Sequence, residues 1–113
     1  MVERAEEAAE LGEQIRASYE KLNSLSREDL KKLERLEKLA RKIRGNAGGS
    51  DTEQSLEKPP DKLDAAVERL SDLSNQLKDG VKKTSRMVVS AKVIQRSNEV
   101  IQVVKIIKNF LRP

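Results

Sequence analysis

The stretch that decides the fold is residues 91–111, AKVIQRSNEVIQVVKIIKNFL, the most apolar part of a chain in which 37% of the residues are charged. Read at helical spacing, it carries one apolar stripe that further apolar residues widen on both sides. A helix that is apolar beyond a single stripe needs neighbours on more than one side. We therefore expect this helix to form the core. The stripe is Val93, Val100, Val104, Ile107 and Leu111, widened by Ile94 and Ile101 on one side and by Val103, Ile106 and Phe110 on the other.

The composition is typical of long helices. The 113 residues fit one domain, aromatic residues make up only 2%, and Gly and Pro number five and three. Leu, Lys, Glu, Arg and Ala dominate the rest, which favours helices or coiled coil. The high charge would also suit a disordered chain, but the net charge of +4 is modest and the apolar residues are periodic. An ordered helical protein is therefore the better interpretation.

Apolar periodicity predicts four helices in a single domain, residues 1–113. Their expected ranges are 3–22, 26–45, 61–84 and 90–112, with a polar linker at 47–60 that contains Gly-Gly and Pro-Pro. The break between the first two helices rests on Asn23 and on Ser26, which has Asp29 three residues later as in a helix-capping pair. Because the first stripe is thin and this break is soft, one continuous helix from Glu3 to Arg44 remains an alternative.

The predicted fold class is all-α, with three to four helices in a bundle or coiled-coil-like packing around the C-terminal helix. The last three helices should form this bundle, while the first extends it or joins a partner chain. Narrow leucine stripes beside one broad apolar helix also predict uncovered apolar surface on the monomer. A homodimer, or another helical protein, would cover it. The expected interface residues are Val93, Ile94, Val100, Ile101, Val103, Val104, Ile106, Ile107, Phe110 and Leu111.

The excess positive charge falls on the same C-terminal segment, since residues 85–113 hold six basic residues and one acidic residue. These cations could contact an anionic membrane surface or the phosphates of nucleic acid. The absence of Trp and of an aromatic stacking platform makes both partners the weaker alternative to a core role. The candidate anion contacts are Lys92, Arg96, Lys105, Lys108 and Arg112.

No catalytic or cofactor-binding pattern stands out. With no His and no Cys, the chain lacks the residues of His-dependent triads, zinc sites and haem ligation. The glutamates of the first thirteen residues are interpreted as a solvated helix face rather than a cation site. No uncharged run approaches the roughly 18 residues of a membrane-spanning helix. The sequence therefore predicts a non-enzymatic structural or protein–protein interaction module, without a cofactor and self-associating.

Two stretches resemble small, uncharacterised all-helical bacterial proteins. One is LEKLARKIR at residues 36–44, running into Ala47-Gly48-Gly49, and the other is VVSAKVI at residues 88–94, followed by Ser97-Asn98-Glu99. The resemblance implies no activity. It implies that such proteins often begin with an export signal, which would place the mature chain in the cell envelope. The acidic residues after Met1 do not form a signal peptide, so the cytoplasm is the other expected compartment.

Overall fold

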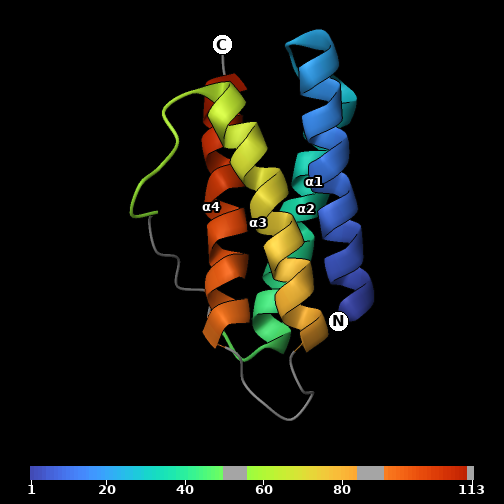
Figure 1. Ribbon diagram of the computed structural model, residues 1–113, viewed down its shortest axis with the longest axis vertical. Helices are drawn as coiled ribbons and strands as arrows, with labels where there is room; N and C mark the ends of the chain where they lie inside the picture. Colours follow the sequence, from blue (N-terminus) through green and yellow to red (C-terminus); the bar gives the residue numbers. More distant parts are fainter. Residues whose placement is uncertain (50–55, 84–90, 112–113) are drawn as a thin grey trace.

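The chain folds as four helices, seen in a computed structural model that describes residues 1–49, 56–83 and 91–111. They are α1 (Val2–Leu22), α2 (Arg27–Asn46), α3 (Leu63–Lys83) and α4 (Ala91–Leu111) (Figure 1). The described residues contain no strand, so the predicted all-α helical bundle is confirmed. The helix ends predicted at residues 84, 90 and 112 lie outside the described residues, as does part of the predicted linker, residues 50–55.

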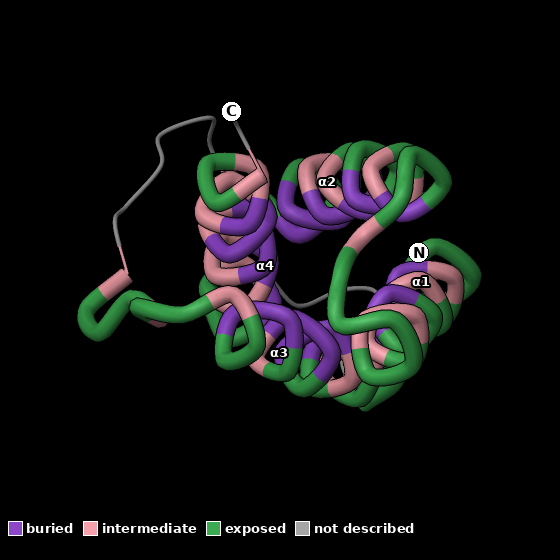
Figure 2. Tube along the Cα trace, turned by 90° about the horizontal axis from the view of Figure 1, so that it is seen from above, coloured by how far each residue is buried: buried purple, intermediate pink, exposed green. Residues whose placement is uncertain are grey.

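The four helices stand at the corners of a square, as Figure 2 shows from above. In the described part of the chain, α1 and α4 each pack against α2 and α3, whereas the backbones of the diagonal pairs, α1–α4 and α2–α3, stay farther apart. In Figure 1, α1 and α4 run upward and α2 and α3 run downward, so all neighbouring pairs are antiparallel. Helix α2 ends at the opposite pole from the start of α3, and the described residues 56–62 lead into α3 at its pole. This topology is that of a bundle with one long crossover.

The chain turns between α1 and α2 at Asn23, so the alternative of one continuous helix is wrong. Asn23 adopts the left-handed conformation, with φ of 53°, and its amide donates to the Tyr19 carbonyl at 2.7 Å. Asn tolerates this conformation better than most residues. Ser26 then begins α2 with a complete capping box, in which its side chain accepts from the Asp29 amide and the Asp29 side chain accepts from the Ser26 amide. The expected capping pair is confirmed.

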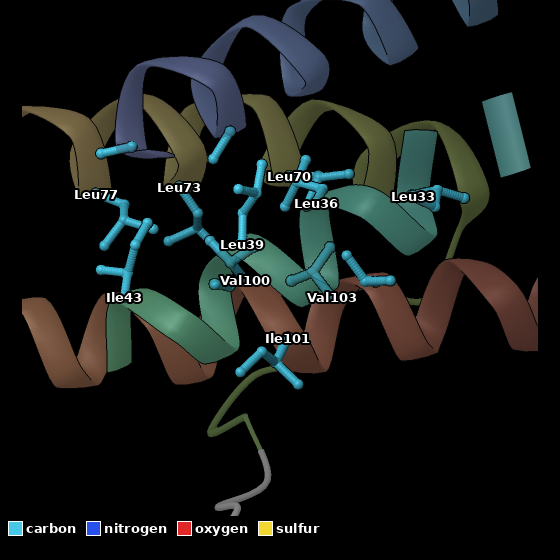
Figure 3. Packing of buried hydrophobic residues seen from close by; sticks show 14 of the residues in the cluster. Leu33, Leu36, Leu39, Ile43, Leu70, Leu73, Leu77, Val100, Ile101 and Val103 are labelled. Carbon is cyan, nitrogen blue, oxygen red and sulfur yellow. The ribbon is translucent and has the colours of Figure 1, made fainter. Parts of the chain in front are cut away.

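The core fills the centre of the square with aliphatic side chains from all four helices (Figure 3). Leu36 of α2, Leu70 of α3 and Val100 of α4 are fully buried there. The broad apolar surface of α4 is covered by α2 and α3, while the described part of the crossover, residues 56–62, lies beside its outer side in Figures 1 and 2. Leu56 of this segment packs against the core. The need of α4 for several neighbours is thus met inside one copy of the chain.

Helix α1 is the fourth member of this bundle and approaches α3 closely through small residues. Gly12 faces Ser71 and Ser74, and a Cβ atom at residue 12 would lie 3.1 Å from the Ser74 Oγ and 3.3 Å from the Ser71 Cα. Ala5 and Ala8 are fully buried along the same helix. The thin stripe of α1 therefore reflects close packing of two backbones and not a loosely attached helix.

Candidate interaction surface

The predicted interface residues of α4 mostly face the core of their own chain. Six of the ten are buried to 1% exposure or less: Val93, Val100, Ile101, Val103, Val104 and Ile107. Ile94, Ile106 and Leu111 are half-buried. Phe110 is 42% exposed, so its ring is available to a partner. The surface that α4 offers to a second molecule is therefore narrower than its apolar sequence implies.

The candidate anion-contacting residues do not form one continuous patch. Lys92 is exposed, and Lys105 is half-buried. Arg96 is paired with Glu99 of the same helix at 2.7 Å, and the Lys108 Nζ reaches the Glu37 carboxylate of α2 at 3.4 Å. Part of this positive charge is consequently neutralised within the chain. Arg112 lies outside the described residues.

Helix packing gives the bundle a charged sidedness that the linear sequence does not reveal. Helix α2 has eight basic and four acidic residues, and α4 beside it has four and one. Helix α1 has three basic and six acidic residues, and its neighbour α3 has four of each. We call these two halves the α2–α4 side, with a net charge of +7, and the α1–α3 side, with a net charge of −3.

Three exposed lysines on α2 make the strongest positive feature of the α2–α4 side. Lys31, Lys38 and Lys42 follow one another at steps of seven and four residues, which keeps them on one face of the helix. Among the described residues they take part in no ion pair. We call them the lysine row. Arg35 does not belong to it, because it forms a two-pronged pair with Glu7 of α1, at 2.8 and 3.1 Å, which lowers the pKa of that carboxyl.

The outward face of α4 is polar but carries little charge. Gln95, Gln102 and Asn109 recur at steps of seven residues, and Asn98 lies toward α2, where its oxygen accepts from Arg44. Gln95 and Asn109 are exposed, whereas Asn98 and Gln102 are half-buried. Protein–protein interfaces are depleted in charged residues at their centre, as this amide face is. Surfaces that bind phosphate polymers place cations there instead.

Four exposed glutamates dominate the α1–α3 side. Glu3, Glu6, Glu10 and Glu13 follow the steps three, four and three, and we call them the glutamate row. The last three line a shallow groove of about 290 Å³ between α1 and α3. Glu6 is paired with Lys82 at 3.3 Å, and Glu13 with Arg16 at 3.0 Å.

Among the described residues, no cluster of three or more potential ligand side chains could hold a metal ion. None of the helices that the structure describes has the length and hydropathy needed to span a membrane.

Two buried charged residues tie helices together, and the sequence identified only one of them. Arg44 is 1% exposed and its Nη1 donates to Asn98 Oδ1 of α4 at 2.7 Å. Gly49 lies against it, because a Cβ there would come within 2.6 Å of the Arg44 Cγ. An arginine in the last turn of a helix is normally predicted to be exposed, because its favourable interaction with the helix dipole needs no burial. The sequence therefore did not predict that Arg44 is buried.

The second is Asp29, which fixes the α1–α2 corner. It is 1% exposed and accepts from the Ser18 hydroxyl of α1 at 2.8 Å, in addition to the Ser26 amide at 2.9 Å. Burial alone would raise its pKa, but the hydrogen bonds from Ser26 and Ser18 outweigh this and hold the pKa below the ordinary value of 3.8. The sequence predicted the cap but not the bond to α1.

This network predicts acid sensitivity at the α1–α2 corner. Because the folded-state pKa of Asp29 lies below 3.8, its contribution to stability is present above that value and is lost as the pH falls through the folded-state pKa. We expect Asp29→Asn to lower the free energy of unfolding by about 1 kcal/mol at pH 7, with a smaller difference from wild type at pH 2.5. Urea denaturation at both pH values measures this. Asp72→Asn on the exposed surface of α3 is the control, and an equal deficit for Asp29→Asn at both pH values would contradict the assignment.

Comparisons with protein-family models, with curated proteins and with solved structures found no match to this chain.

Proposed function

We propose that the chain is a non-enzymatic helical interaction module that self-associates, and that its α2–α4 side is the surface that binds. The single observation that carries the proposal is the separation of charge between the α2–α4 side and the α1–α3 side. Complementary charge guides association and selects partners more than it adds affinity. The amide face of α4 supplies an area of low charge for such a contact, and the exposed Phe110 ring adds an apolar group near the end of the same helix.

Self-association should appear in sedimentation velocity as a concentration-dependent increase above the monomer mass of 12.7 kDa. We expect the increase in 50 mM salt and its reduction in 500 mM salt. The reason is that the distance over which exposed charges interact falls from about 10 Å at moderate ionic strength to about 3 Å at high ionic strength. A monomer mass at every concentration in 50 mM salt would overturn the proposal.

A second candidate function is binding to an anionic membrane surface or to nucleic acid. It is favoured by the position of α2, which adds its own basic residues to those of α4 on one side of the bundle. The amide face of α4, which carries little charge, favours a protein partner instead. Binding to vesicles of anionic lipid tests the membrane surface as partner, and binding to a duplex DNA tests nucleic acid, each in 50 mM salt. Retention of the protein by neutral vesicles as well as by anionic ones would contradict an electrostatic interaction.

A further inference from the structure

We infer that the occupant of the α2–α4 side is the α1–α3 side of a second copy of this chain, docked head to tail. The inference rests on the proposed self-association and specifies its geometry. One chain carries both complementary halves, a net charge of +7 on one side and −3 on the other. These halves lie on opposite sides of the square in Figure 2. The lysine row and the glutamate row lie on α2 and α1, which are neighbouring corners in contact with each other. Both rows are exposed, so one copy can present them at once.

Pairing of identical sides is disfavoured by the same charges. A symmetric dimer uses the same patch on both subunits. Placed on the α2–α4 side, that patch would set the exposed lysine row of one copy against the same row of the other, and like charges placed opposite one another oppose association. Nor is an apolar seam available to outweigh the repulsion, since Val100, Val104 and Ile107 of α4 are fully buried in their own chain.

The two charged rows also match in length. From Lys31 to Lys42 there are eleven residues, or about 16 Å along the helix axis, and from Glu3 to Glu13 there are ten, or about 15 Å. Both rows are exposed and follow helical steps of three, four or seven residues. Two straight helices laid side by side can therefore bring each lysine near a glutamate.

Contacts inside the chain leave the lysine row and two members of the glutamate row, Glu3 and Glu10, outside the ion pairs of the described residues. Two neighbouring cations are already engaged, Arg35 with Glu7 and Lys108 with Glu37. On the opposite side, Glu3 takes part in no ion pair among the described residues, and Glu10 is bonded only to the Gln14 amide at 3.5 Å. The docking contact therefore forms without breaking an existing ion pair of these residues.

A head-to-tail contact uses different surfaces on the two copies. However many copies are added, one α2–α4 side and one α1–α3 side therefore stay exposed at the ends. Unless the rotation closes a ring, such contacts produce open chains. This property allows a mixing experiment. One variant, Lys38→Gln with Lys42→Gln, removes two of the three charges of the lysine row. The other, Glu3→Gln with Glu10→Gln, removes the two charges of the glutamate row that are not already in an ion pair.

Alone, each variant should associate at least about tenfold more weakly than wild type in sedimentation velocity at 50 mM salt. The reason is that the contact needs the lysine row of one copy and the glutamate row of the other within the range of about 10 Å over which exposed charges interact. An equimolar mixture should form a dimer that does not grow. In that dimer the intact glutamate row of the first variant contacts the intact lysine row of the second, and the two rows left exposed are the substituted ones. Circular dichroism should report unchanged helix content.

Controls with the same change of charge are available in the described part of the crossover. Lys58→Gln with Lys62→Gln matches the first variant, and Glu57→Gln with Asp61→Asn matches the second. Both controls should associate like wild type. Three results overturn the inference while the proposed self-association stands: one variant keeps wild-type association, the mixture stays as weakly associated as its components, or the controls lose association equally. A wild type that stays monomeric overturns both.

Discussion

Replacing Val104 by Glu should strongly destabilise the protein. Val104 is fully buried in the core, where a carboxylate would have neither water nor a cation to stabilise it. An uncompensated buried charge costs about 3–5 kcal/mol, and the total stability expected for a chain of this length is about 6–15 kcal/mol. We therefore expect loss of a large part of the free energy of unfolding, seen as a large fall in the urea midpoint.

The same substitution separates a core position from an interface position. If Val104 lay only between two copies, Glu would dissociate them and leave a folded helical monomer with a wild-type denaturation midpoint. Circular dichroism during urea denaturation, at a protein concentration where wild type is monomeric, tells the two apart. Val104→Ala should cost about 2 kcal/mol, as expected for lost methyl groups and a small cavity. Gln95→Glu, exposed on the same helix, should have little effect.

Replacing Gly12 by Val should cost about 1–3 kcal/mol, although Gly is the poorer helix former. The new Cβ would lie 3.2 Å from the Ser74 Cβ and 3.3 Å from the Ser71 Cα, and a backbone atom cannot move aside without moving α3. Urea or thermal denaturation measures the change. A stability equal to or above that of wild type would show that α1 and α3 are not packed this closely.

Gly45→Ala is the matched control for that substitution. Gly45 also lies within a helix, but a Cβ there meets nothing within 4 Å. The substitution should therefore raise the free energy of unfolding by about 0.5–1 kcal/mol through helix propensity alone. A fall in the free energy of unfolding at residue 12 together with a rise at residue 45 would separate the effect of close packing from that of replacing a glycine.

Helix positions were predictable because they depend on local signals. The stripe of α4, the linker glycines after Arg44 and the Ser26–Asp29 box are all readable within a few residues. These signals placed the described helix ends within two residues of those observed. The four-cornered arrangement was not predictable in the same way. It depends on the path of the crossover, and a polar linker of this length can place α3 beside either end of α2.

The candidate surface was only partly predictable for the same reason. The cations of α4 are visible in the sequence, but the lysine row lies on α2 and joins them only through tertiary packing. Sequence also treated all ten apolar interface residues of α4 alike. A helical wheel measures apolar width, and it cannot tell whether the second neighbour comes from the same chain or from another. Here α2 and α3 cover six of the ten.

The direction of the crossover has a further consequence for any polypeptide joined to the two ends of the bundle. Four helices in simple alternation would return the chain to the pole where it entered. Because α2 and α3 run the same way, the chain enters at one pole through Val2 and leaves at the other through Leu111 (Figure 1). Attached segments would be held apart by about 30 Å, the length of a 21-residue helix. In mechanical terms the bundle is an in-line spacer rather than a hairpin.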